Sequence, residues 1–200
     1  MVLNSDQEVA LSNVLRNARI HRGDNTQTML EQSPVADSRS NGFIERAIQT
    51  VEGQIRTMKS ALGRRLDVKM PNDRCIIPWL VEHAGNILTR FEVGKEGKTP
   101  IQRLKGRKLR TQLVEFGECV SFLPADYAKQ GKMEPRWKEG VYLGIRLESS
   151  EMLVGNEDGV SKCRSLRRKT EDERWNAGAV ECVKGIHGNP TNSLRMTSCV

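Results

Sequence analysis

Apolar residues recur at helical spacing through the middle of the chain. Between Phe43 and Leu66 they return every three or four positions, which is the repeat of one helix face. A second stretch with the same repeat runs from Ile77 to Phe91. The pattern therefore predicts two amphipathic helices. Their expected inward positions are Ile44, Ile48, Val51, Ile55, Met58 and Leu62 in the first, and Leu80, Ala84, Ile87, Leu88 and Phe91 in the second.

The N-terminal pattern is shorter. Met1-Val2-Leu3 is typical of the end of a buried strand, and residues 5–17 predict a helix. Ser5 would cap that helix, with Glu8 completing a capping box. Residues 21–41 are polar, which indicates a loop that ends in an Asn-Gly turn before the next helix.

The repeat changes after residue 112. Residues 113–123, 140–145, 151–154 and 160–168 read as short strands, with a hairpin turn at 155–159. Several short strands with glycine between them predict a small β-barrel. A turn-rich stretch, 94–106, precedes them, and residues 176–200 lack an apolar repeat and are expected to be disordered.

Charge adds a partner class to this picture. The chain of 200 residues carries a net charge of +7. Residues 41–75 hold seven Lys and Arg against four acids, and residues 76–115 hold eight against four. Positive charge concentrated in the middle favours a polyanionic partner, and a solvated basic surface is the alternative.

Cysteine and hydropathy patterns exclude other classes. The five cysteines form no close pair and have no neighbouring His pair, so neither a disulfide framework nor a zinc site is indicated. No apolar run approaches membrane-spanning length, so we expect no membrane partner. His83 is expected to be a packed or surface histidine rather than a catalyst. Core anchors, rather than base-stacking platforms, are expected at Trp79, Trp137 and Trp175.

Two carboxylates suggest metal chemistry. Asp6 follows the N-terminal strand, and Glu45 lies in the first turn of the long helix. Phosphoryl transfer with divalent metals uses carboxylates contributed by different elements, and Mg²⁺ or Mn²⁺ is the ion they prefer.

Four landmarks, in order along the chain, carry a resemblance to a known family. Residues 40–46, Ser-Asn-Gly-Phe-Ile-Glu-Arg, resemble the third-acid motif of retroelement integrases, those of copia-type retrotransposons in particular. Residues 97–100 resemble that family's Thr-Pro segment, 115–120 its Phe-Gly strand and 138–144 its Gly-x-x-Leu-Gly strand. The order and spacing of the four together are specific.

This resemblance implies an α+β fold. The chain would hold a truncated ribonuclease H-like domain, mainly helices here, followed by a small antiparallel β-barrel of SH3-like type. The implied boundaries are 1–70 for the catalytic part, 71–112 for a helix and basic linker, 113–175 for the barrel and 176–200 for the tail.

The resemblance also implies roles for residues. Asp6 would match the family's second catalytic Asp and Glu45 its catalytic Glu, both binding Mg²⁺ or Mn²⁺. DNA, as element ends and target, is the implied partner, with self-association and an intracellular location in cytoplasm and nucleus. The implied DNA contacts are Arg46, Arg56, Lys59, Arg64, Arg65, Lys105, Arg107 and Lys108, with Arg103 and Arg110 on the same track. A third basic cluster is Lys162, Arg164, Arg167, Arg168 and Lys169.

One departure from the family bears on activity. Its first catalytic Asp lies on a strand upstream of the second, and this chain begins five residues before Asp6. We therefore expect that a full site needs an upstream Asp and that this chain alone has little strand-transfer activity. A non-catalytic DNA-binding or scaffold protein derived from such an element is the alternative. An unrelated metal nuclease would leave the downstream landmarks unexplained.

Overall fold

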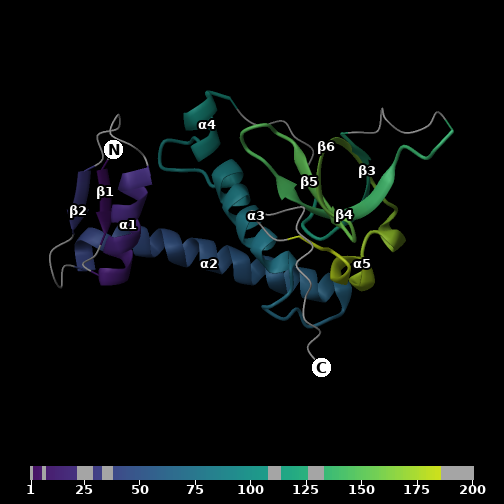
Figure 1. Ribbon diagram of the computed structural model, residues 1–200, viewed down its shortest axis with the longest axis horizontal. Helices are drawn as coiled ribbons and strands as arrows, with labels where there is room; N and C mark the ends of the chain where they lie inside the picture. Colours follow the sequence, from purple (N-terminus) through teal and green to yellow (C-terminus); the bar gives the residue numbers. More distant parts are fainter. Residues whose placement is uncertain are drawn as a thin grey trace. The chain divides into compact units, whose positions relative to one another are not determined.

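The structure is a computed structural model that describes residues 2–5, 8–21, 29–32, 38–107, 114–125 and 133–185. Helices and strands are both present, as Figure 1 shows, so the expected α+β class is confirmed. The chain divides into two compact units, Met1–Glu52 and Gly53–Val200. In the described part no helix is long and apolar enough to cross a membrane.

The first unit begins with a strand–helix–strand crossover. Strand β1, Val2–Ser5, pairs in parallel with β2, Met29–Gln32, and helix α1, Val9–His21, connects them. Parallel neighbours need such a crossover because a tight turn cannot join them. The strand expected at 1–3 is confirmed, but residues 21–41 are not all loop, since β2 lies within them.

Two expected boundaries in this unit were wrong. Ser5 is paired with Gln32 in the strand ladder, so it does not cap a helix, and α1 starts four residues later. The long helix α2, Ser38–Leu66, already includes Asn41 and Gly42, where a turn was expected. A glycine inside a helix costs only about 1 kcal/mol, and a helix of 29 residues can absorb that cost.

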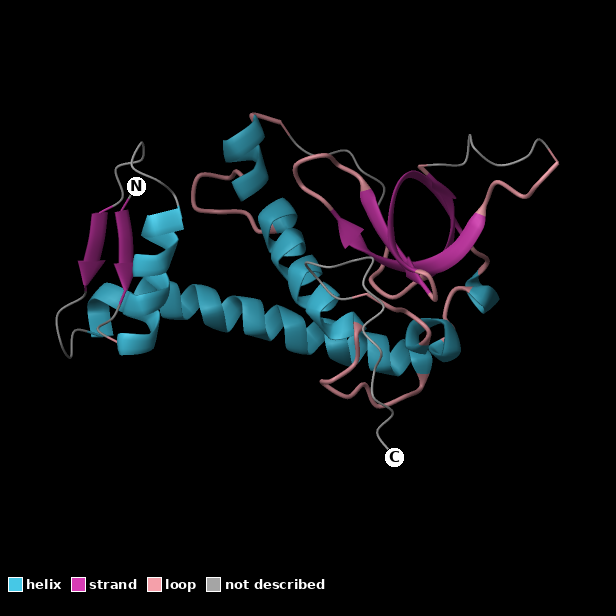
Figure 2. Cartoon of the chain, in the orientation of Figure 1, coloured by secondary structure: helices cyan, strands magenta, loops and turns pink. Residues whose placement is uncertain are grey.

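The second unit is built around a closed antiparallel barrel, drawn as magenta arrows in Figure 2. Its strands are β3, Cys119–Pro124; β4, Lys138–Ile145; β5, Met152–Asn156; and β6, Gly159–Arg168. The expected hairpin is confirmed, since Asn156 pairs with Gly159 across a two-residue turn. The expected small barrel is confirmed, although its first strand starts at Cys119 rather than at residue 113.

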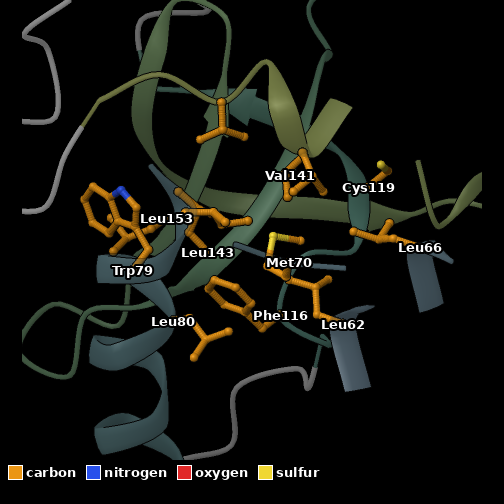
Figure 3. Packing of buried hydrophobic residues seen from close by; sticks show 13 residues of the cluster. Leu62, Leu66, Met70, Trp79, Leu80, Phe116, Cys119, Val141, Leu143 and Leu153 are labelled. Carbon is orange, nitrogen blue, oxygen red and sulfur yellow. The ribbon is translucent and has the colours of Figure 1, made fainter. Parts of the chain in front are cut away.

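Two layers of apolar side chains hold this unit together. One fills the barrel and consists of Val114, Val120, Phe122, Tyr142, Met152, Val154 and Cys163, with Leu166 against it. The other lies between the barrel wall and the helices, where Figure 3 shows Trp79 and Leu80 of α3, Ile76–Phe91, facing Leu143 and Leu153. Its members are Leu62, Leu66, Met70, Ile76, Trp79, Leu80, Phe116, Cys119, Val141, Leu143, Leu153, Val180 and Val183.

The apolar stripes of the two long helices are only partly buried. In α2 the stripe is covered toward its C-terminal end, at Leu62, whereas Ile44 and Ile48 are exposed. The helix α3 confirms the expected span within one residue and buries Leu80 and Ala84, but Phe91 is 47% exposed, contrary to expectation. Helical spacing identifies a face without saying which part of it meets a partner.

Two further helices correct the sequence reading. In the stretch expected to be turns, α4, Pro100–Lys105, begins after Thr99, whose side chain forms a capping box with Gln102. Proline suits the first helical position since its missing N–H needs no partner there. In the segment expected to be disordered, α5, Ala177–Glu181, follows the 3-10 turn η2, Glu171–Glu173, and buries Val180. Residues 186–200 of that segment lie outside the described residues.

Two glycines permit close approaches that the fold needs. Gly117 has φ of 85°, and a Cβ there would lie 2.4 Å from Leu62 Cδ1. Gly144 has φ of 145° at the irregularity between β4 and β5, and a Cβ there would lie 3.0 Å from His83 Nδ1. Both positions therefore favour glycine, for backbone conformation and for space.

Candidate nucleic-acid interface

The two carboxylates proposed for catalysis are not seen together. Asp6 lies outside the described residues, and Glu45 is exposed on α2 within the first unit. Among the residues that the structure describes, no three His, Cys, Asp or Glu side chains are grouped so as to hold a metal ion. Glu45 is thus an exposed carboxylate, and the described residues do not constitute a metal centre.

The cations of α2 do not share one face. At 3.6 residues per turn, Arg65 points about 180° away from Arg56. Arg46 and Arg64 are exposed, whereas Lys59 is half-buried and donates to Asn72 Oδ1. Arg65 lies 3.4 Å from Glu115 Oε1, and its guanidinium stands 5.3 Å from the centre of the Trp175 ring.

The basic run around α4 is partly engaged in protein contacts. Arg103 pairs with Glu96 at 3.4 Å, and the ammonium group of Lys105 donates to the carbonyl of Leu147. Arg107 is exposed just after the helix. Lys108 and Arg110 lie outside the described residues.

Strand β6 presents the most coherent row of cations. Strict alternation would put Arg167 on the same side as the buried Cys163. The register with β3 instead shifts between Phe122 and Pro124, so Leu166 and Cys163 both face the barrel interior. This β-bulge turns Arg167 outward with Lys162 and Arg164.

These three β6 cations are exposed, and one of them rests on an aromatic ring. The Arg167 guanidinium lies 4.2 Å from the centre of the Trp137 ring. Arg164 is 88% exposed and reaches Glu151 Oε1 only at 4.0 Å.

The three tryptophans, all expected to be core anchors, are buried to different degrees. Trp79 is a core anchor, 2% exposed, whose Nε1 donates to the carbonyl of Gly185. Trp175 is half-buried and packs against the same apolar core, with Arg65 over its ring, whereas Trp137 is half-buried under Arg167.

The remaining two residues of the third basic cluster have structural partners. Arg168 donates from Nε and Nη2 to the two carboxylate oxygens of Glu118, at 2.7 and 2.8 Å. Glu118 is fully buried and is also approached by Arg174 Nε at 3.3 Å. The Glu118 carboxylate accordingly raises the pKa of Arg168. Lys169 pairs with Glu139 at 2.7 Å.

Glu118 is a residue whose importance sequence reasoning missed. It stands in the apolar run Phe116–Val120, where an acid is out of place unless it is paired. That signal marked a buried carboxylate. Its two arginine partners come from β6 and from the segment after η2, and no spacing in the sequence predicts that pairing.

A cavity of about 400 Å³ opens in the second unit between α2, α3 and the segment leading into β3. Its lining combines apolar side chains with His83, which is 3% exposed and confirms the expectation of a packed histidine. Burial, and secondarily the charge of Arg90, lower the pKa of His83 to about 4. The lining residues are Gln54, Met58, Ala61, Leu62, Arg65, His83, Ile87, Val114, Glu115, Phe116, Arg168 and Trp175.

Comparison with known proteins gives no assignment. No protein-family model and no curated protein matches this chain.

Proposed function

We propose that this chain binds nucleic acid through the outer surface of its barrel, with Lys162, Arg164 and Arg167 of β6 as the central contacts. The observation that carries the proposal is the β-bulge that turns Arg167 to the outer side of the barrel, where Lys162 and Arg164 also lie. Cations on phosphates supply sequence-independent affinity. Arg107 and Arg64 are further exposed cations of the same unit that would extend the contact.

We further infer descent from a copia-type integrase, with an SH3-like barrel after elements of a ribonuclease H-like domain. The support is the four-landmark resemblance together with what those residues do. Thr99 and Pro100 start α4, while Gly117 and Gly144 are glycines that the packing requires. In this reading Glu45 and Asp6 belong to the lineage's Mg²⁺ or Mn²⁺ site. Of that pair, Glu45 lies within the described residues, exposed on α2.

One observation favours the second candidate, a non-catalytic DNA-binding or scaffold protein derived from such an element. The β6 cations belong to the unit Gly53–Val200, whereas Glu45 belongs to Met1–Glu52. The proposed binding surface is thus complete within a unit that contains neither carboxylate. Binding that survives Glu45→Gln is expected under both candidates, and metal-dependent strand joining only under the first.

Salt dependence of DNA binding tests the proposal. Fluorescence anisotropy with a labelled duplex would follow the dissociation constant of the full chain as salt is raised. Replacing Lys162, Arg164 and Arg167 by Gln should reduce the slope of log K against log salt by up to about 3, since each phosphate contact contributes about 0.9. Equal slopes for the variant and the parent chain would refute this surface.

A matched control removes the same charges elsewhere. Arg16, Arg19 and Lys95 are exposed and lie outside the proposed surface. Their replacement by Gln lowers the net charge by the same amount, so it reports the effect of overall charge alone. The proposal requires that this control keep most of the parent slope.

A further inference from the structure

The cavity beside α2 has the character of a ligand site. Its volume of about 400 Å³ falls within the range of small-molecule pockets, which are mostly apolar with a few polar groups. Met58, Leu62 and Ile87 give it aliphatic walls, and Phe116 and Trp175 give it aromatic ones. A flat apolar ring is the shape and chemistry that such walls accommodate.

His83 supplies a polar group that the fold leaves unsatisfied. Its ring lies 5.4 Å from that of Phe116 and 5.9 Å from that of Tyr142, and it lines the cavity. The Nδ1 atom is buried and has no hydrogen-bond partner among the described residues. A buried polar group without a partner is uncommon, and this one lies against Gly144, where a Cβ would be 3.0 Å from it.

The charges around the cavity favour an anion. Arg65 stands at the cavity with Glu115 as its partner, while the single carboxylate of Glu118 is shared by Arg168 and Arg174. One positive charge is left over in this group.

We propose that this cavity binds a nucleotide, with the base between the α2 and α3 side chains and Phe116, and the phosphate at Arg65. The nucleotide is a free mononucleotide or the unpaired end of a nucleic-acid strand. The second source rests on the function proposed above. Stacking on aromatic side chains suits any base, because each has a π-face.

Filling the cavity is the first test. Ala61 lines it, and Ala61→Leu would occupy part of its volume without removing a helix former from α2. Titration calorimetry with deoxyadenosine monophosphate should show binding to the full chain that Ala61→Leu weakens about tenfold or more. Ala47→Leu is the matched control, since Ala47 is an exposed residue of the same helix. No binding by the parent chain, or equal affinity for Ala61→Leu, would overturn the proposal.

A second variant separates base from phosphate and guards against misfolding. Arg65→Gln should bind deoxyadenosine as the parent chain does but lose the preference for the monophosphate. A parent chain that binds nucleoside and nucleotide equally would overturn the assigned role of Arg65. Melting curves of all variants show whether each is folded.

The source of the nucleotide is decided by comparing two duplexes, one blunt and one with unpaired terminal nucleotides. Tighter binding of the second, lost in Ala61→Leu, supports the strand end. Binding of the mononucleotide with no preference between duplexes supports the free nucleotide. Failure of the proposed function looks different, because then neither duplex binds while the mononucleotide still does.

Discussion

Removing Arg168 should destabilise the second unit more than removing its partner Glu118. The carboxylate of Glu118 is fully buried, whereas the side chains of Arg168 and Arg174 are 33% and 25% exposed. Arg168→Met would leave the carboxylate buried with Arg174, at 3.3 Å, as its only cation, and with the Glu115 N–H, which donates to Oε2 at 3.3 Å. Breaking a buried pair in this way costs about 3–5 kcal/mol.

Glu118→Gln leaves Arg168 and Arg174 without the carboxylate that they share. Both arginines retain contact with water, so their charges can be hydrated after the carboxylate is gone. The cost should then approach that of lost hydrogen bonds to a charged group, about 1.5–3 kcal/mol. The double variant should be less destabilised than the sum of the two single changes, because no unpaired buried carboxylate remains.

Urea denaturation measures this asymmetry. Tryptophan fluorescence reports on the second unit, because Trp79, Trp137 and Trp175 all belong to it. The free energy of unfolding of the four proteins gives both single costs and the coupling between the sites. A larger loss for Glu118→Gln than for Arg168→Met, or costs that simply add, would refute the reasoning from exposure.

Two further predictions concern His83 and Gly117. The pKa of His83 is about 4 in the folded protein, against a usual value of 6.5, so between these pH values the unfolded chain binds a proton that the folded protein does not. The free energy of unfolding should therefore fall by about 3 kcal/mol as the pH drops from 6.5 to 4. The fall should be smaller in His83→Gln. Urea denaturation at several pH values would measure this fall, and an equal pH dependence of the free energy of unfolding in the parent chain and in His83→Gln would contradict the prediction. Gly117→Ala should cost more than Gly106→Ala, because both have positive φ but only the Gly117 methyl would meet Leu62; melting temperatures that fall equally would contradict this.

The sequence predicted the elements whose period is long and regular. Helix α3 and the β5–β6 hairpin lie close to their expected positions, since each combines an apolar repeat with a clear boundary signal. Strand β2 was missed because it has four residues in a polar segment and depends on pairing with β1. Propensity cannot predict a strand whose stability comes from its neighbour.

The candidate interface was only partly predictable, for a similar reason. Lys162, Arg164 and Arg167 were identified as basic, but the side each one faces depends on a bulge in the register with β3. The same cluster contained Arg168, whose charge is used by Glu118. Composition counts charges, whereas the tertiary fold decides which of them are available to a ligand.

The apolar residues of the first unit also show what sequence periodicity leaves open. Val9, Leu11 and Val14 are apolar positions of the helix predicted there, yet they are 74%, 38% and 61% exposed. None of the residues of α1 is buried. Periodicity therefore predicted a helix there without predicting a covered face.

Mapping the DNA contact by backbone amide NMR would test the central claim most directly. A labelled full chain would be titrated with a short duplex, and shifts would be followed along β6 and the rest of the second unit. The proposed function predicts that the largest shifts cluster at residues 162–167 and around Trp137, and that they fade as salt is raised. Shifts confined to other elements, with β6 unchanged at saturating duplex, would contradict it.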